Sequence, residues 1–177
     1  ELLDPLLPEL ILPEVNNPKV WGGWDEAFYD PQNQYLLGLF DDITAPYFNA
    51  RKLDPERVKK LGLKVLLEPD LKGKIVWIDP RVRGPGGPYL ALLDHVVGPD
   101  NLRRLLTDQD VIFVKSENEA ADAVVRGRAV VALGNRPGEA LRQYTKAGLD
   151  LDIRSFGNDP GIGWKGTGGG TIGLFNK

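Results

Sequence analysis

The 177-residue sequence contains no cysteine, no methionine and only one histidine. Without cysteine, the chain cannot form disulfides, use a thiolate nucleophile or build a zinc site on sulfur ligands. The single histidine, His95, falls among apolar residues in a predicted helix, where a structural or surface role is more expected than general-base chemistry. The longest apolar runs, such as Val130–Leu133, are far too short to span a bilayer.

A strong excess of one charge is also missing. The net charge is −3 and the pI is about 5.3, so there is no electrostatic reason to expect nucleic acid or an anionic membrane surface as a partner. Hydrophobic residues make up 42% and charged residues 27%, which is typical of globular proteins and unlike disordered ones. Because methionine is absent, we expect that residue 1 is not a natural start and that the sequence is an excised or processed stretch.

Glycine and proline are frequent, with 21 and 14 residues, and they separate alternating strands and helices. Strands are predicted over residues 35–40, 74–78, 111–114, 129–133, 151–156 and 171–175, and helices over 54–61, 88–97, 101–106, 116–126 and 137–146. Residues 157–170 are expected to form a glycine-rich loop. This alternation predicts an α/β protein with a mixed, mostly parallel sheet flanked by helices.

Two of the helix starts carry specific signals. Asp54 is a predicted N-cap that is followed by proline at the first helical position. Ser116 and Glu119 form a predicted capping box, in which each side chain accepts from a backbone N–H of the other residue.

Two loops have the form of ligand-binding loops, because in open α/β sheets ligands bind beyond the carboxyl ends of the strands. Residues 79–87 follow the strand 74–78, residues 134–136 follow the strand 129–133, and each loop leads into a helix that begins with proline. Glycines let backbone amides approach a ligand, and a helix N-terminus offers unpaired N–H groups. The candidate residues in these loops are Asp79, Arg81, Arg83, Gly84, Gly86, Asn135 and Arg136.

The side chains in these loops suggest the chemistry of a ligand. The arginines are suited to carboxylate, phosphate or sulfate, and Asp79 is suited to hydroxyls or amines. Trp164, in the glycine-rich loop, is a further candidate contact, whereas Trp77 alternates with isoleucines in a buried strand and is expected in the core. The alternative explanation is ordinary turn chemistry with solvated arginines.

Enzyme chemistry has little support in the sequence. There are two serines: Ser116 is explained as a helix cap and Ser155 lies in a strand, so there is no nucleophile elbow. Adjacent carboxylates such as Asp41 and Asp42 face opposite sides of an extended segment and cannot cooperate. Histidine and cysteine clusters for a metal are absent, and residues 166–170 are not a phosphate loop. We therefore predict a binding protein, not an enzyme, with no cofactor and no metal.

The run Lys72–Arg81, Lys-Gly-Lys-Ile-Val-Trp-Ile-Asp-Pro-Arg, is followed by Gly84 and a helix. It resembles a segment of the family 1 extracellular solute-binding proteins of ABC transporters, with the ferric-iron-type branch closest. Four more segments are similar to this family in matching order, namely residues 21–29, 34–53, 124–134 and 168–177. The resemblance covers nearly the whole chain, and the order of the five segments carries it.

The resemblance implies a type II periplasmic-binding-protein-like fold, in which two α/β lobes close on a small-molecule solute. Residues 1–43 would then be the tail end of lobe one with the first crossing strand, 44–168 lobe two, and 169–177 the returning crossing strand. The implied partners are the rest of lobe one, missing from this chain, and a membrane permease. The implied location is periplasmic or extracellular.

The resemblance does not transfer a ligand. Ferric-binding members of the family typically carry two adjacent tyrosines, whereas the five tyrosines here are isolated, so iron is disfavoured. The arginines favour an anion, and a neutral sugar remains open through Trp164 and Asn135. Two other functions stay open: a non-transport sensor or interaction module of the same fold, and a doubly wound hydrolase or transferase. The last requires His95 or Ser155 beside a carboxylate in the cleft.

Overall fold

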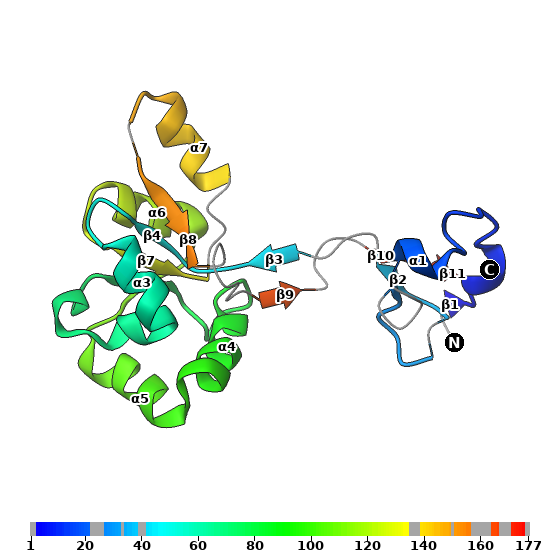
Figure 1. The fold of residues 1–177 in the computed structure, drawn as a ribbon, viewed down its shortest axis with the longest axis horizontal. Helices are drawn as coiled ribbons and strands as arrows, with labels where there is room; N and C mark the ends of the chain where they lie inside the picture. The colour runs from blue at the N-terminus through cyan, green and yellow to red at the C-terminus, as the bar shows by residue number, and fades with distance from the viewer. Residues whose placement is uncertain are drawn as a thin grey trace. The chain divides into compact units, whose positions relative to one another are not determined.

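The structure is a computed structural model, and it describes residues 3–21, 27–32, 34–38, 42–134, 139–149, 151–156, 164–166 and 171–175. The chain forms two compact units (Figure 1). One consists of Glu1–Ile43 and Lys165–Lys177, and the other of Thr44–Trp164. None of the helices in the described part of the chain has the length and apolar character that a membrane span requires.

The unit Thr44–Trp164 is built on a five-stranded sheet in the order β6-β5-β7-β4-β8. The strands are β4 (Tyr47–Asn49), β5 (Ile75–Ile78), β6 (Ile112–Val114), β7 (Val131–Leu133) and β8 (Ile153–Ser155). β5 pairs parallel with β6 and β7, whereas β4 pairs antiparallel with β7 and β8. β8 therefore runs in the direction of β5, and only β4 opposes the rest. The predicted mixed, mostly parallel sheet is confirmed.

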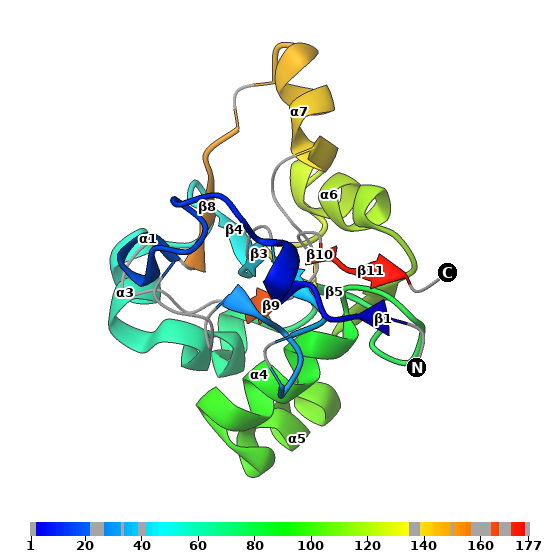
Figure 2. The same cartoon turned by 90° about the vertical axis from the view of Figure 1, so that its right-hand side faces the viewer.

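Helices cover both faces of this sheet. They are α3 (Pro55–Leu61), α4 (Gly87–Val97), α5 (Pro99–Asp108), α6 (Glu117–Val125) and α7 (Glu139–Lys146), with 3₁₀ turns η2 (Gly62–Leu67) and η3 (Pro69–Leu71). α4 and α5 lie on one side, and α6 and α7 on the other (Figures 1 and 2).

The core lies on both faces of the sheet, and β5 contributes side chains to each face. Its side chains alternate between faces, so Ile75 and Trp77 join the cluster that contains Leu93 and Leu105, whereas Val76 and Ile78 join the cluster of α6 alanines. A strand that is buried on both sides reads as a continuous apolar run, which is why the sequence predicts it well. Trp77 has no exposed surface, as expected, and its Nε1 donates to the carbonyl oxygen of Gly86 at 3.1 Å.

The predicted helix starts at Asp54 and Ser116 are confirmed. Asp54 Oδ1 accepts from the Glu56 N–H at 3.0 Å, and Ser116 Oγ accepts from the Glu119 N–H at 3.2 Å. The predicted reciprocal hydrogen bond of the capping box, from the Ser116 N–H to the Glu119 side chain, is wrong. The Glu119 carboxylate accepts instead from the N–H of Lys115, at 3.2 Å, one residue before the cap. The side chain still satisfies a backbone donor that precedes the helix.

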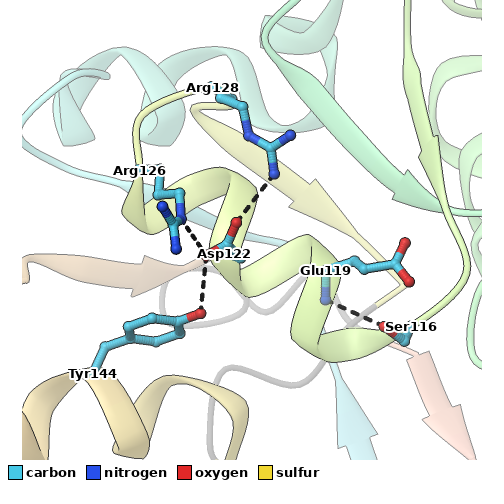
Figure 3. A network of polar contacts seen from close by, with 6 residues as sticks. All are labelled: Ser116, Glu119, Asp122, Arg126, Arg128 and Tyr144. Atoms are coloured by element: carbon cyan, nitrogen blue, oxygen red, sulfur yellow. Dashed lines mark hydrogen bonds and ion pairs between the residues drawn. The ribbon is translucent and has the colours of Figure 1, made fainter.

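A polar network joins α7 to α6 (Figure 3). The carboxylate of Asp122 accepts from Arg126 Nε at 2.5 Å, Arg128 Nη2 at 3.1 Å and the Tyr144 hydroxyl at 3.2 Å. The hydrogen bond from Arg126 is the largest influence that lowers the pKa of Asp122. Leu141 adds an apolar contact from α7 to the same face.

The other unit contains short elements, which are β1 (Leu3–Asp4), η1 (Leu7–Glu9), α1 (Pro18–Trp21), β2 (Leu37–Gly38), β10 (Thr171–Ile172) and β11 (Leu174–Phe175). β1 pairs with β11 and β2 with β10, both antiparallel. Leu6, Phe28 and Leu37 form part of its small buried cluster.

Strands β3 (Asp42–Thr44) and β9 (Trp164–Gly166) pair with each other where the chain passes from one unit to the other and back. The prediction of a loop throughout residues 157–170 is wrong at residues 164–166, which form β9 and are the only described residues of this stretch. A glycine-rich stretch has weak strand propensity, so its pairing with β3 overrides the local preference. The predicted strand over residues 171–175 is divided by Gly173 into β10 and β11.

Replacing Ser116 with alanine should lower the free energy of unfolding by about 1 kcal/mol, because α6 loses its N-cap acceptor. Urea unfolding followed by circular dichroism measures the change. Ser116→Thr, which keeps an acceptor oxygen, should lose clearly less. Equal stability of Ser116→Ala and the parent chain would contradict the assigned cap.

Candidate ligand-binding site

The carboxyl ends of β5 and β7 lie side by side. The two strands are parallel neighbours, with Trp77 opposite Leu133. The segments that follow are in backbone contact, since a Cβ on Gly134 would lie 2.9 Å from the Gly86 Cα and 3.2 Å from the Pro85 carbonyl oxygen. The loop 79–87 and the loop that starts at Gly134 therefore share one edge of the sheet.

Gly86 fixes the path of the first loop. A Cβ at this position would lie only 1.9 Å from the carbonyl oxygen of Ile78, so the loop folds back against the end of its own strand. Its carbonyl oxygen accepts from Trp77 Nε1. Gly134 has φ +80°, which side chains rarely adopt. Both glycines thus allow close backbone packing. This packing places the start of α4 at the edge that β5 and β7 share.

Asp79 and Arg81 bind each other within this loop. Arg81 Nε donates to Asp79 Oδ1 at 2.8 Å and Nη2 to Oδ2 at 2.7 Å, and the Arg81 N–H also donates to Oδ1, at 3.0 Å. The Arg81 side chain is 79% exposed, and its guanidinium carbon lies 5.7 Å from the centre of the Phe113 ring. The side-chain hydrogen bond from Arg81 is the main cause that lowers the pKa of Asp79 to about 2. A ligand would have to break or share this pair to use either side chain.

Arg83 and Gly84 are exposed. Arg83 makes no hydrogen bond or ion pair with other residues in the described ranges, so its charge is available. Gly86 precedes α4, and no described side chain caps this helix start. Tyr89, in the first turn of α4, is 1% exposed and packs in the core cluster with Trp77 and Leu93, a placement that its position after Pro88 did not predict.

The remaining candidate residues come from the second loop, the glycine-rich stretch and the enzyme hypothesis. Asn135 and Arg136 lie outside the described residues. Trp164 is the first residue of β9, and only its backbone is described. Of the enzyme candidates, His95 is exposed on α4 and Ser155 lies in β8. Among the described residues, there is no group of three or more acidic or histidine side chains placed to hold a metal.

Comparison with known proteins identifies the fold. No protein-family model and no curated protein matches the chain. Among solved structures, iron-bound HitA from Pseudomonas aeruginosa matches with a TM-score of 0.56 and 24% identity, over 90% of this chain and 49% of that chain. A two-component system protein that mediates signal transduction matches with a TM-score of 0.54 and 17% identity, over 72% of this chain and 41% of that chain. A periplasmic thiamin-binding protein matches with a TM-score of 0.51 and 19% identity, over 75% of this chain and 42% of that chain.

These similarities are below 25% identity and show the fold alone. The chain has a periplasmic-binding-protein fold, with a mixed sheet between helices like one lobe of such a protein. It spans about half the length of the solved structures that it matches, or less.

Replacing Gly86 with alanine should lower the free energy of unfolding by more than about 2 kcal/mol, because the new methyl group would overlap the Ile78 carbonyl. The neighbouring Gly87 is the matched control. A Cβ there would meet nothing closer than the Pro80 carbonyl oxygen at 3.9 Å, so Gly87→Ala should change stability by less than about 0.5 kcal/mol. Chemical denaturation measures both variants, and similar losses would contradict the assigned close approach.

The carboxylate of Asp79 should titrate near pH 2 in the parent chain. Because its pKa is lowered on folding, its contribution to stability is present above its ordinary pKa and is lost as the pH falls towards 2. Arg81→Ala should return the pKa towards its ordinary value of 3.8, whereas Arg83→Ala should leave it unchanged. Carboxyl-carbon NMR measures these values, and a parent midpoint near 4 would exclude the pair in solution.

Proposed function

We propose that this chain is the solute-binding part of an ABC importer and binds a small anionic solute at the carboxyl ends of β5 and β7. The observation that carries this proposal is the shared edge of the two strands, where Arg83 and the uncapped start of α4 lie in one loop. Ligands of open α/β sheets bind at such edges. The periplasmic-binding-protein fold adds support by analogy.

Charge at the proposed site favours an anion. Asp79 and Arg81 neutralise each other, so the carboxylate does not cancel the nearby Arg83. The N-terminus of α4 contributes partial positive charge from backbone N–H groups. Arg136 and Asn135 follow Gly134 directly in the sequence and are proposed to complete the site from the second loop. Gly84 is proposed to let the solute approach the backbone, and Trp164 to contact it.

The proposed partners follow from the same function. A membrane permease would receive the solute, and the protein would act in the periplasm or at the outer cell surface. Residues 1–43 and 169–177 are proposed to belong to lobe one and the crossing strands, and 44–168 to lobe two, with the solute between the lobes. Binding without catalysis is proposed as the activity.

A sensor module is the second candidate, because a two-component signal transduction protein has a similar fold over 72% of this chain. Both functions begin with solute capture and differ in the partner. Solute-dependent stimulation of ATP hydrolysis by a reconstituted importer supports transport. Stimulation of a histidine kinase, with no effect on an importer, supports sensing.

A thermal-shift screen tests the proposed ligand class. Carboxylates and phosphate compounds should raise the melting temperature, whereas sugars, amines and metal salts should not, because only a ligand that binds the folded state stabilises it. Arg83→Ala and Arg136→Ala should each weaken binding of the active anion about tenfold, since each removes a charged donor.

Arg104→Ala is the control, because it removes the same charge from an exposed position on α5. Its affinity for the anion should match that of the parent chain. The assignment fails if sugars or amines stabilise more than anions, or if Arg83→Ala and Arg136→Ala both bind as the parent does.

A further inference from the structure

An open groove lies between α4 and α5, which pack side by side against one face of the sheet (Figures 1 and 2). Its volume is about 330 Å³. One of its lining residues comes from α4 and the others from α5. They are Asp94, Pro99, Leu102, Arg103, Leu106 and Thr107. The residues on α5 recur at a spacing of three or four positions, so they form one stripe along the helix.

The fold leaves apolar side chains exposed at this groove. Leu106 is 40% exposed, although Leu102 beside it in the groove is buried. On α4, Leu90 lies one turn before Asp94 and is 38% exposed. An exposed apolar surface that is rimmed by polar residues is typical of a contact between proteins.

The groove also contains one acid and one base that the fold leaves without a partner. Neither the Asp94 carboxylate nor the Arg103 guanidinium makes a hydrogen bond or an ion pair within the described residues. Asp94 lies in the last turn of α4, where the partial negative charge of the helix end disfavours an acid. A cation from outside the chain would therefore stabilise Asp94, and an anion from outside would stabilise Arg103.

A second copy of the chain supplies both charges. In a dimer with two-fold symmetry every contact occurs twice, with the roles of the two chains exchanged. A two-fold axis through the groove would pair Asp94 of each copy with Arg103 of the other copy. A surface that carries both members of a charge pair is thus complementary to itself, whereas a partner with one sign of charge would satisfy only one of them.

We propose that the groove between α4 and α5 is a dimer interface between two copies of this chain, stabilised by apolar contacts and by two reciprocal ion pairs between Asp94 and Arg103. This inference goes beyond the proposed solute-binding function and does not depend on it. Asp94 lies seven residues after Gly87, where α4 begins, which is roughly 10 Å along the helix axis. The interface therefore uses the end of α4 that is opposite to the candidate ligand-binding site.

A second groove in the described part of the chain lacks this self-complementarity. It has a volume of about 200 Å³ and lies between α3 and β8, where Phe48, Phe156 and Arg154 are among its lining residues. Arg154 is already paired with Asp152 at 3.0 Å within the same chain. This groove therefore gives no reason to expect a second copy.

Charge-reversal variants of the full 177-residue chain test the interface by sedimentation-velocity ultracentrifugation. The parent chain should form a weak dimer with a Kd of about 100 µM, because the contact is on the scale of transient interfaces. Asp94→Arg and Arg103→Asp should each weaken dimerisation by about tenfold or more, since each change places like charges opposite each other twice.

Mixing the two variants in equal amounts should restore the dimer. One chain then contributes two cations and the other two anions, so both ion pairs form again between the chains. The double variant D94R/R103D should dimerise on its own for the same reason. Arg104→Asp is the matched control, because it makes the same charge change at the next residue of α5, which does not line the groove. It should dimerise as the parent chain does.

Three results would contradict the proposal. The first is a parent chain that remains monomeric up to about 1 mM. The second is a parent dimer that Asp94→Arg and Arg103→Asp leave equally tight, because another exposed apolar surface, such as the one at Phe175, then forms the contact. The third is a dimer that both variants abolish and that mixing does not restore, since the two charges then do not pair between chains.

Discussion

The carbonyl oxygen of Ile78 occupies the place where Gly86 would carry a side chain, and this close approach determines how the site is built. It folds the loop after β5 onto the end of the strand, where Trp77 Nε1 fixes the Gly86 carbonyl and the Gly134 backbone packs alongside. The first turn of α4 therefore begins at the edge that β5 and β7 share. Without that contact, the arginines of the loop and the helix start would have no fixed relation to the second loop.

The sheet makes this arrangement rigid. β5 is buried on both faces, with one apolar cluster under α4 and α5 and another under α6 and α7. Apolar burial supplies most of the stability of such a layered fold. Exposed ion pairs such as Asp122 with Arg126 contribute little individually. The hydrogen bond from Tyr144 to Asp122 joins α7, which follows the second candidate loop, to α6.

Local pairing also decides which charges a solute can meet. Asp79 forms an ion pair with Arg81, Asp122 with Arg126, and Asp152 with Arg154. Each of these carboxylates lies within four residues of its arginine in the sequence, so the pairing needs little ordering of the chain. Arg83 lies four residues after Asp79, but that carboxylate is paired with Arg81, and Arg83 makes no ion pair within the described residues. A protein with a net charge of −3 can therefore still present a positive group at the edge where the solute is proposed to bind.

Several features of this fold are local, and the sequence determines them. The apolar run of β5, the caps at Asp54 and Ser116 and the alternation of strands and helices depend on neighbouring residues, so they predict the α/β class and the loops after β5 and β7. Other features depend on residues far apart in the chain and could not be predicted. Only the tertiary structure decides that β4 opposes the other strands, that β9 pairs with β3 and that Gly86 packs against Gly134. It also decides that the Tyr89 side chain is buried, with no hydrogen-bond partner for its hydroxyl among the described residues, because burial and hydrogen bonding are properties of the surroundings and not of the local sequence.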